Sequence, residues 1–161
     1  MLRIIIDVFE KWKTSMVSMI VELRNIEDTE AAIGWAGGHT IVVDRPEGKA
    51  GGRGLGFNGG QLLGLAIGGC FCNDLRYVAG DIGVRLSKIA VTVTVELEGD
   101  PLMTKAVTMD VSCETADGSD PQGIIERAKA TCMVSNSVSR GFPVIVQSAT
   151  NGMDRPLLPN M

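Results

Sequence analysis

Two cysteines are the residues of this sequence best suited to chemistry. Cys70 lies in the segment Gly-Gly-Cys-Phe-Cys, and Cys132 lies in Ala-Thr-Cys-Met-Val-Ser-Asn. They are too far apart in the chain to form a local metal-binding knuckle, in which two cysteines are separated by about two to four residues. Each lies in a segment whose pattern is typical of a buried, ordered helix. If the fold brings the two thiols together, they form a dithiol that can cycle through a disulfide.

Helical geometry separates Cys70 from its neighbour Cys72. Residues two apart on a helix point about 200° away from each other, so only one of the two thiols can face Cys132. The face of Cys70 becomes polar toward Asp74, which suits a partly accessible, reactive thiol. We interpret Cys72, and Cys113 in a predicted strand, as small packed hydrophobic residues.

Metal binding is the other common use of four cysteines. Zinc sites combine closely spaced cysteine pairs or histidines, whereas this chain offers Cys-x-Cys on a helix and the single histidine His39, interpreted as a surface or turn residue. The glycine-rich segment 48–60 lacks the Gly-Lys-Ser/Thr ending of a phosphate-binding loop. We therefore expect neither a metal site nor a cofactor.

Composition narrows the function classes further. A chain of 161 residues with 45% hydrophobic residues can form one domain with a core that needs no disulfides. The net charge of −4, without a run of Lys or Arg, predicts no nucleic-acid partner. No apolar stretch reaches the roughly 18 residues of a membrane span, and Asp7 and Glu10 make the N-terminus a poor secretory signal. We expect a cytoplasmic protein without a membrane partner, in which thiols stay reduced.

The elements that must position the cysteines follow from the apolar patterns. The first part reads as a small meander, with strands near residues 18–24 and 40–43 and turns at 36–38 and 45–48. A long helix over residues 61–78 is apolar around most of its circumference, which predicts burial on nearly all sides. Gly64 and Gly68 share one face of it and each costs about 1 kcal/mol in helix propensity. Their presence predicts that another element approaches that face closely.

The second half reads as a hairpin, a helix and a final strand. Alternating apolar residues predict strands over 87–98 and 106–113. Ser119-Asp120-Pro121 then starts a second helix, which we expect to run unbroken to about Ser139 and to stop at Gly141. A last strand is predicted over 143–147.

Four sequence blocks resemble one known family. They begin at Thr40 (Thr-Ile-Val-Val-Asp-Arg-Pro-Glu-Gly-Lys-Ala-Gly-Gly), Asn58 (Asn-Gly-Gly-Gln-Leu), Gly69 (Gly-Cys-Phe) and Cys132 (Cys-Met-Val-Ser-Asn-Ser-Val-Ser-Arg-Gly). In order and spacing they look like the OsmC/Ohr family, the osmotically inducible protein C-like and organic hydroperoxide resistance proteins. The resemblance covers residues 18–148, leaving 1–17 as an N-terminal extension and 149–161 as a C-terminal tail. It implies an α+β, OsmC-like fold with antiparallel β-sheets, two central helices and an intertwined homodimer.

The resemblance also implies a function, a thiol-dependent peroxidase that reduces organic hydroperoxides. Cys70 would attack the peroxide and become a sulfenic acid, Cys132 would resolve it as a disulfide, and an external dithiol would reduce the disulfide. In the family an N-terminal arginine activates the thiolate. Arg24, Arg45 and Arg53 are the candidates, and we favour Arg45 for its place in Asp-Arg-Pro, with Arg24 as the alternative.

Two other functions stay open, and three positions depart from the family pattern. The chain could instead be a non-enzymatic binder of small molecules in an apolar dimer cleft, or a structural or zinc-binding dimer. Gly60 stands where the peroxidases have the glutamate that holds the arginine, and Met133 stands where a proline usually follows the second cysteine. Asp74, one helical turn after Cys70, would disfavour the Cys70 thiolate if it faced the thiol.

Overall fold

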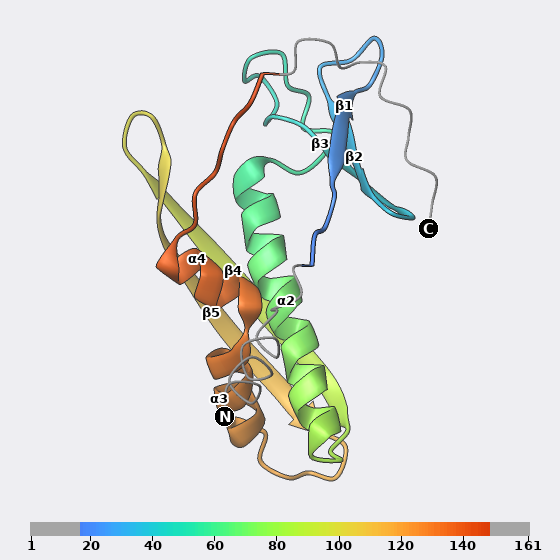
Figure 1. Cartoon of the computed structure of the whole chain (residues 1–161), viewed down its shortest axis with the longest axis vertical. Helices are drawn as coiled ribbons and strands as arrows, with labels where there is room; N and C mark the ends of the chain where they lie inside the picture. The colour runs from blue at the N-terminus through green and yellow to red at the C-terminus, as the bar shows by residue number, and fades with distance from the viewer. Residues whose placement is uncertain (1–16, 149–161) are drawn as a thin grey trace, which may run out of the picture. The chain divides into compact units, whose positions relative to one another are not determined.

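A computed structural model describes residues 17–148 of the chain. The predicted tail and all but the last residue of the predicted N-terminal extension lie outside the described residues. The chain divides into two compact units, one ending at residue 56 and the other beginning at residue 57. Figure 1 shows the helices and strands of the described residues in chain order.

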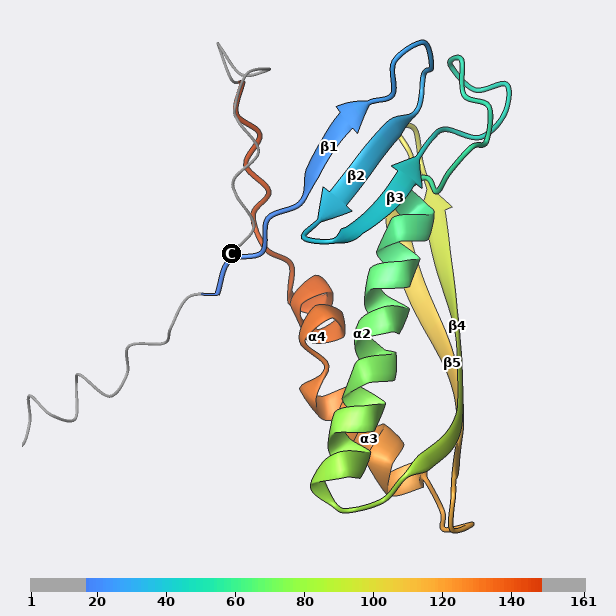
Figure 2. The ribbon, with the colours of Figure 1, turned by 90° about the vertical axis from the view of Figure 1, so that its right-hand side faces the viewer.

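The first unit is a three-stranded antiparallel sheet (Figure 2). Its strands β1 (Glu22–Asn25), β2 (Ala32–Ala36) and β3 (His39–Val43) are hydrogen-bonded in the order β1-β2-β3. The predicted meander is confirmed, although β1 begins four residues later than predicted and the middle strand β2 was not predicted. His39 is the exposed first residue of β3, in agreement with its interpretation as a surface residue.

A buried carboxylate holds the glycine-rich segment that follows β3. Asp44 accepts hydrogen bonds from the backbone N–H groups of Arg45, Arg53 and Leu55 at 2.7, 3.0 and 3.0 Å. These donors, Leu55 first, hold the pKa of Asp44 below its usual value. The side chain that fixes this loop, Asp44, therefore belongs to the same unit as the loop.

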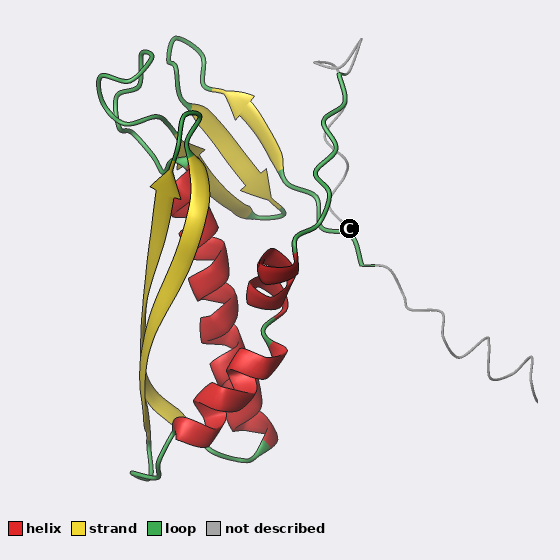
Figure 3. Ribbon diagram, turned by 90° about the vertical axis from the view of Figure 1, so that its left-hand side faces the viewer, coloured by secondary structure: helices red, strands yellow, loops and turns green. Residues whose placement is uncertain are grey.

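The second unit has three layers around one long helix (Figures 2 and 3). Helix α2 (Gly59–Asp81) lies between the hairpin of β4 (Leu86–Glu98) and β5 (Met103–Thr115) on one side and the short helices α3 (Gln122–Thr131) and α4 (Met133–Arg140) on the other. The predicted hairpin is confirmed. The buried core joins all three layers and contains Phe71, Leu75, Val78, Ala79, Cys113, Ile124, Ala128 and Cys132.

Helix α2 starts on a capping box that the predicted boundary at residue 61 missed. The Asn58 side chain accepts from the Gln61 N–H at 3.0 Å, and the Gln61 side chain accepts from the Asn58 N–H at 2.9 Å. This reciprocal pair satisfies backbone donors that a helix start leaves without partners. Part of the family-like block Asn-Gly-Gly-Gln-Leu is therefore a helix-starting device.

The close approach predicted at Gly64 and Gly68 is confirmed, and the approaching element is β4. A Cβ atom on Gly68 would lie 2.8 Å from a methyl carbon of Val93, and one on Gly64 would lie 3.4 Å from a methyl carbon of Val95. The expectation that α2 is buried on nearly all sides is wrong, because Leu65 is 50% exposed in the described chain. The helix is covered on the sides that meet the hairpin and the two short helices.

Two predictions for the C-terminal part are wrong. The helix predicted to run unbroken to residue 139 is two helices, α3 and α4, separated at Cys132, although α4 does end at Gly141 as predicted, where the backbone φ is 74°. The strand predicted over 143–147 does not form, because none of the described strands pairs with this segment. Val144, Ile145 and Val146 are instead exposed.

No helix within residues 17–148 combines the length and apolar character needed to cross a membrane.

Candidate active site

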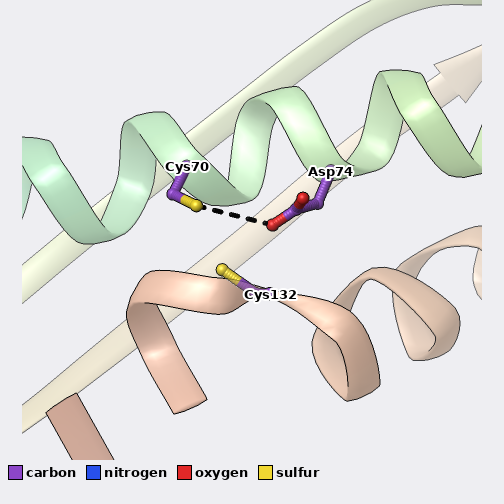
Figure 4. Close-up of side chains that lie close together, drawn as sticks. All are labelled: Cys70, Asp74 and Cys132. Carbon is purple, nitrogen blue, oxygen red and sulfur yellow. Dashed lines mark hydrogen bonds between the residues drawn. The ribbon is translucent and has the colours of Figure 1, made fainter. Parts of the chain in front are cut away.

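Cys70 and Asp74 lie one turn apart on α2 and face the short helices (Figure 4). Residues four apart on a helix share a face, and here the Cys70 thiol donates to Oδ2 of Asp74 at an Sγ to Oδ2 distance of 3.7 Å. Both side chains are half-buried. Asp74 therefore faces the Cys70 thiol, the case that the sequence analysis considered.

Cys132 lies at the break between α3 and α4. Its backbone is extended at ψ 112°, which ends α3 and lets α4 begin at the next residue. The side-chain amide of Asn136 donates to the Cys132 carbonyl at 2.7 Å and to the Ala130 carbonyl at 3.3 Å, so it satisfies acceptors that the break leaves free. Figure 4 shows the Cys132 sulfur pointing toward Cys70 and Asp74.

The three side chains form a compact cluster. The two sulfur atoms and a carboxylate oxygen of Asp74 all lie within 4.8 Å of one another. Cys132 is fully buried, and this burial raises the pKa of its thiol, while the hydroxyl and N–H of Ser135 act in the opposite direction. One half-buried thiol and one fully buried thiol thus lie side by side.

The same three donors are the candidates for a bound metal ion. Thiolates and a carboxylate suit Zn²⁺, but a structural zinc site is closed by about four protein ligands. Among residues 17–148 the cluster offers Cys70, Asp74 and Cys132 only. Within the described residues the cluster is therefore one protein ligand short of a closed structural zinc site.

The other two cysteines do not reach the cluster. Cys113 lies in β5, where burial raises the pKa of its thiol. Cys72 was predicted to be packed, but it forms part of the wall of an open groove. Neither thiol shares the environment of Cys70.

The groove beside Cys72 is an apolar hollow between α2 and β4. Its volume is about 640 Å³. Leu65, Val93 and Leu97 contribute apolar walls, and Gly64 and Gly68 form its floor along the helix. Cys70 and Cys132 do not line it, so the cluster and the groove are separate features.

The favoured candidate Arg45 and its alternative Arg24 lie in the first unit, and each has partners there. Arg45 Nη2 donates to the Glu30 carbonyl at 3.0 Å and lies 3.5 Å from a carboxylate oxygen of Glu30. The guanidinium of Arg24 lies 5.6 Å from the centre of the Trp35 ring, a cation–π contact. A glutamate therefore holds Arg45 in this chain, although the family position for it is Gly60. The role of either arginine toward Cys70 stays a prediction.

The sequence-based interpretation missed two residues that shape the site. Asn136 could have been found from its spacing four residues after Cys132, which is the distance at which a helical side chain reaches back to a carbonyl. Glu30 carries no such signal, because it meets Arg45 only through the pairing of the strands.

A profile of the OsmC-like protein family matches residues 51–147, more than half of the chain and both cysteines of the cluster. The chain belongs to the OsmC-like family. No curated protein is similar enough in sequence to match it. Its membership confirms the family predicted from the four sequence blocks.

Solved structures share the OsmC-like fold at low sequence identity. An OsmC-like protein from Mycoplasma pneumoniae is 15% identical at a TM-score of 0.64, with 76% of this chain and 88% of that chain covered. An organic hydroperoxide resistance protein from Elizabethkingia anophelis is 19% identical at a TM-score of 0.58, with 80% and 91% covered. The organic hydroperoxide resistance protein OhrB of Bacillus subtilis is 21% identical at a TM-score of 0.53, with 78% and 92% covered. These likenesses establish the α+β fold.

Proposed function

We propose that this protein is a thiol peroxidase that reduces organic hydroperoxides through a Cys70/Cys132 dithiol–disulfide cycle. The observation that carries the proposal is the pair of sulfur atoms within 4.8 Å, one half-buried and one fully buried. A half-buried thiol can meet a peroxide, and a buried thiol beside it can act only after the first has reacted. Membership of the OsmC-like family, with hydroperoxide resistance proteins among its fold relatives, supports the same chemistry.

The cycle has three steps. The Cys70 thiolate attacks a peroxide oxygen, the O–O bond breaks, and a sulfenic acid and an alcohol are formed. Cys132 then attacks the Cys70 sulfur and releases water, which leaves a disulfide. An external dithiol reduces the disulfide by thiol–disulfide exchange and restores both thiols.

A turnover assay tests this function. We expect the protein to consume tert-butyl hydroperoxide in the presence of dithiothreitol and Cys70→Ser to abolish the reaction. Cys132→Ser should stop at a sulfenic acid that dimedone traps on Cys70. Cys72→Ser is the matched control, because Cys72 lies on the same helix outside the cluster, and it should keep full turnover. Undiminished turnover in Cys70→Ser would refute the proposal.

Arg45 is our candidate for the cation that activates Cys70, and Arg24 is the alternative. Thiolates need a positive neighbour to form at neutral pH, and Arg45 is held by Glu30 as a positioned arginine would be. The proposed domain over residues 18–148 includes the sheet that carries both arginines. Arg45→Gln should lower kcat/KM for the hydroperoxide, and Arg24→Gln should not. The reverse ranking would assign the role to Arg24.

We further propose that the protein is a homodimer that works in the cytoplasm, where external dithiols keep thiols reduced. Several apolar side chains of the described chain are exposed, a pattern that marks interaction surfaces. They include Met19, Ile20 and Val21 before β1, Leu65 on α2, and Val144, Ile145 and Val146 after α4. Light scattering coupled to gel filtration should give twice the chain mass. A monomer at micromolar concentration would contradict this assignment.

The apolar groove favours a second candidate, a non-enzymatic binder of small apolar molecules. Its volume of about 640 Å³ is in the range of ligand pockets, which span about 300–1,000 Å³. This function predicts binding of an apolar fluorescent probe that Cys132→Ser leaves unchanged and Leu65→Lys weakens. Probe binding without any peroxide turnover would favour this candidate over the peroxidase.

A further inference from the structure

Asp74 is an unexpected residue to find beside an attacking thiol. The Asp74 carboxylate contacts Cys70 directly, at 3.7 Å between the Cys70 sulfur and a carboxylate oxygen. A negative charge at this place repels the thiolate that attacks the peroxide, because like charges repel. A group that does not assist the first step but lies within 4.8 Å of both sulfur atoms points to a role in a later step.

The resolving thiol of Cys132 needs a group that accepts its proton, and Asp74 is such a group. Cys132 is fully buried, and burial disfavours its charged form. It must nonetheless lose its proton to attack the oxidised Cys70, because the thiolate is the nucleophile. An oxygen of Asp74 lies within 4.8 Å of the Cys132 sulfur as well as of the Cys70 sulfur.

The Asp74 carboxylate is free to accept that proton. In the ion pairs found within residues 17–148, no lysine or arginine neutralises it. It is half-buried, so it can exchange its proton with solvent between turnovers. Its only hydrogen bond to a side chain among the described residues is the one that the Cys70 thiol donates. The S–H group that donates this bond is consumed when Cys70 becomes a sulfenic acid.

We propose that Asp74 is the general base of the resolving step, an inference that rests on the proposed peroxidase function. As the Cys132 sulfur bonds to the Cys70 sulfur, the Cys132 thiol proton moves to the Asp74 carboxylate. The S–O bond of the sulfenic acid breaks, and Asp74 passes the proton to the departing hydroxide, which leaves as water. Two electrons from the Cys132 sulfur enter the new S–S bond, and the electron pair of the S–O bond leaves with the oxygen as water. The Cys132 sulfur is thereby oxidised, the Cys70 sulfur is reduced, and Asp74 ends the step as a carboxylate.

This role predicts opposite effects of Asp74→Asn on two reactions. Alkylation of Cys70 by iodoacetamide needs the thiolate but no base, so removal of the negative charge should speed it by about fivefold, the factor that two unit charges about 4 Å apart exert in water. Disulfide formation should slow by about 100-fold or more, the usual contribution of a general base. A merely structural role would move both rates in the same direction.

The experiment uses the full chain with Cys72→Ser, so that Cys70 is the only half-buried thiol. The protein is mixed with one equivalent of tert-butyl hydroperoxide and quenched over time, and the Cys70 dimedone adduct and the Cys70–Cys132 disulfide are quantified by mass spectrometry. With Asp74→Asn the sulfenic acid should accumulate and the disulfide should appear slowly. Asp74→Glu, which keeps a carboxylate, should form the disulfide at least tenfold faster than Asp74→Asn.

The outcomes separate this inference from the proposed function. If the Asp74→Asn protein closes its disulfide as fast as the parent, or if alkylation and closure slow together, the role of Asp74 is refuted while the peroxidase function stands. If the parent protein forms no sulfenic acid on Cys70, the peroxidase function fails and the role of Asp74 falls with it.

Discussion

Replacement of Gly68 by alanine tests the packing that positions α2 and its cysteine. The added Cβ would lie 2.8 Å from a methyl carbon of Val93 and 3.6 Å from one of Val91. The first distance is shorter than a van der Waals contact, and valine in a strand cannot turn easily because its χ1 angle is restricted. The helix and the hairpin must therefore move apart to admit one methyl group.

The neighbouring glycine provides the matched control. A Cβ on Gly69 would meet no heavy atom within 4 Å, and the same is true of Gly80 near the end of the helix. All three substitutions gain about 1 kcal/mol in helix propensity, but only Gly68→Ala meets an overpacking cost of about 1–3 kcal/mol. We expect Gly68→Ala to lower the free energy of unfolding by up to about 2 kcal/mol and Gly69→Ala to raise it by up to about 1 kcal/mol.

Urea unfolding at one fixed protein concentration measures these differences. The midpoint of Gly68→Ala should fall and those of Gly69→Ala and Gly80→Ala should rise, with similar slopes for all proteins. Because Gly69 borders the apolar groove, Gly80 guards against an effect of the groove itself. If Gly68→Ala is as stable as Gly69→Ala, the close contact of α2 with β4 is not the reason for glycine at this position.

Three further predictions concern the C-terminal half. Met133→Pro should stabilise the protein by about 0.5–1 kcal/mol in urea unfolding, because Cys132 already has the extended backbone that precedes a proline and Met133 is the first residue of α4. The control Ala130→Pro, inside α3, should destabilise the protein by about 3 kcal/mol. Equal effects of the two substitutions would refute the separation of α3 from α4 at Cys132. Asn136→Ala should cost about 1 kcal/mol, since the carbonyls at the break lose their donor, and an unchanged thermal midpoint would contradict this. Asp117 has its pKa lowered from 3.8 to about 2, chiefly by the Ser119 hydroxyl, so its contribution to stability is complete above about pH 3.8 and is lost as the pH falls through about 2. Asp117→Asn should remove that part of the acid sensitivity, and an identical acid profile in the variant would refute the assignment.

The parts of the fold that depend on local pattern were predictable from the sequence. The alternation of Val91, Val93 and Val95 identified β4, and the two glycines one turn apart on α2 identified the face that β4 covers. The stop at Gly141 also follows from local signals. These features need no knowledge of distant contacts.

The remaining parts depend on contacts that the sequence does not encode locally. Nothing in the sequence around Cys132 breaks a helix, because Met133 replaces the family proline, and the break is stabilised by the Asn136 side chain. The strand predicted over 143–147 has the right composition, but a strand also needs a partner, and the described strands provide none. The ion pair of Arg45 with Glu30 likewise arises from strand pairing.

The site itself was predictable in part. Helical geometry correctly separated the faces of Cys70 and Cys72, since one joins the cluster and the other lines the groove. The sequence placed Asp74 and Cys70 on one face of the helix but left open whether they touch, because four-residue spacing does not fix the side-chain rotamers. That Asp74 also lies close to Cys132 depends on how α3 and α4 pack against α2, which only the folded chain reveals.

Whether Cys70 and Cys132 form one redox pair, as we propose, can be decided by counting thiols after oxidation. One equivalent of tert-butyl hydroperoxide is added to the reduced protein, the remaining thiols are titrated, and the bridged peptides are mapped by mass spectrometry. We expect the loss of two thiols, both mapped to a Cys70–Cys132 disulfide, with Cys72 and Cys113 still free. An undiminished thiol count, or a disulfide that joins a different pair, would contradict it.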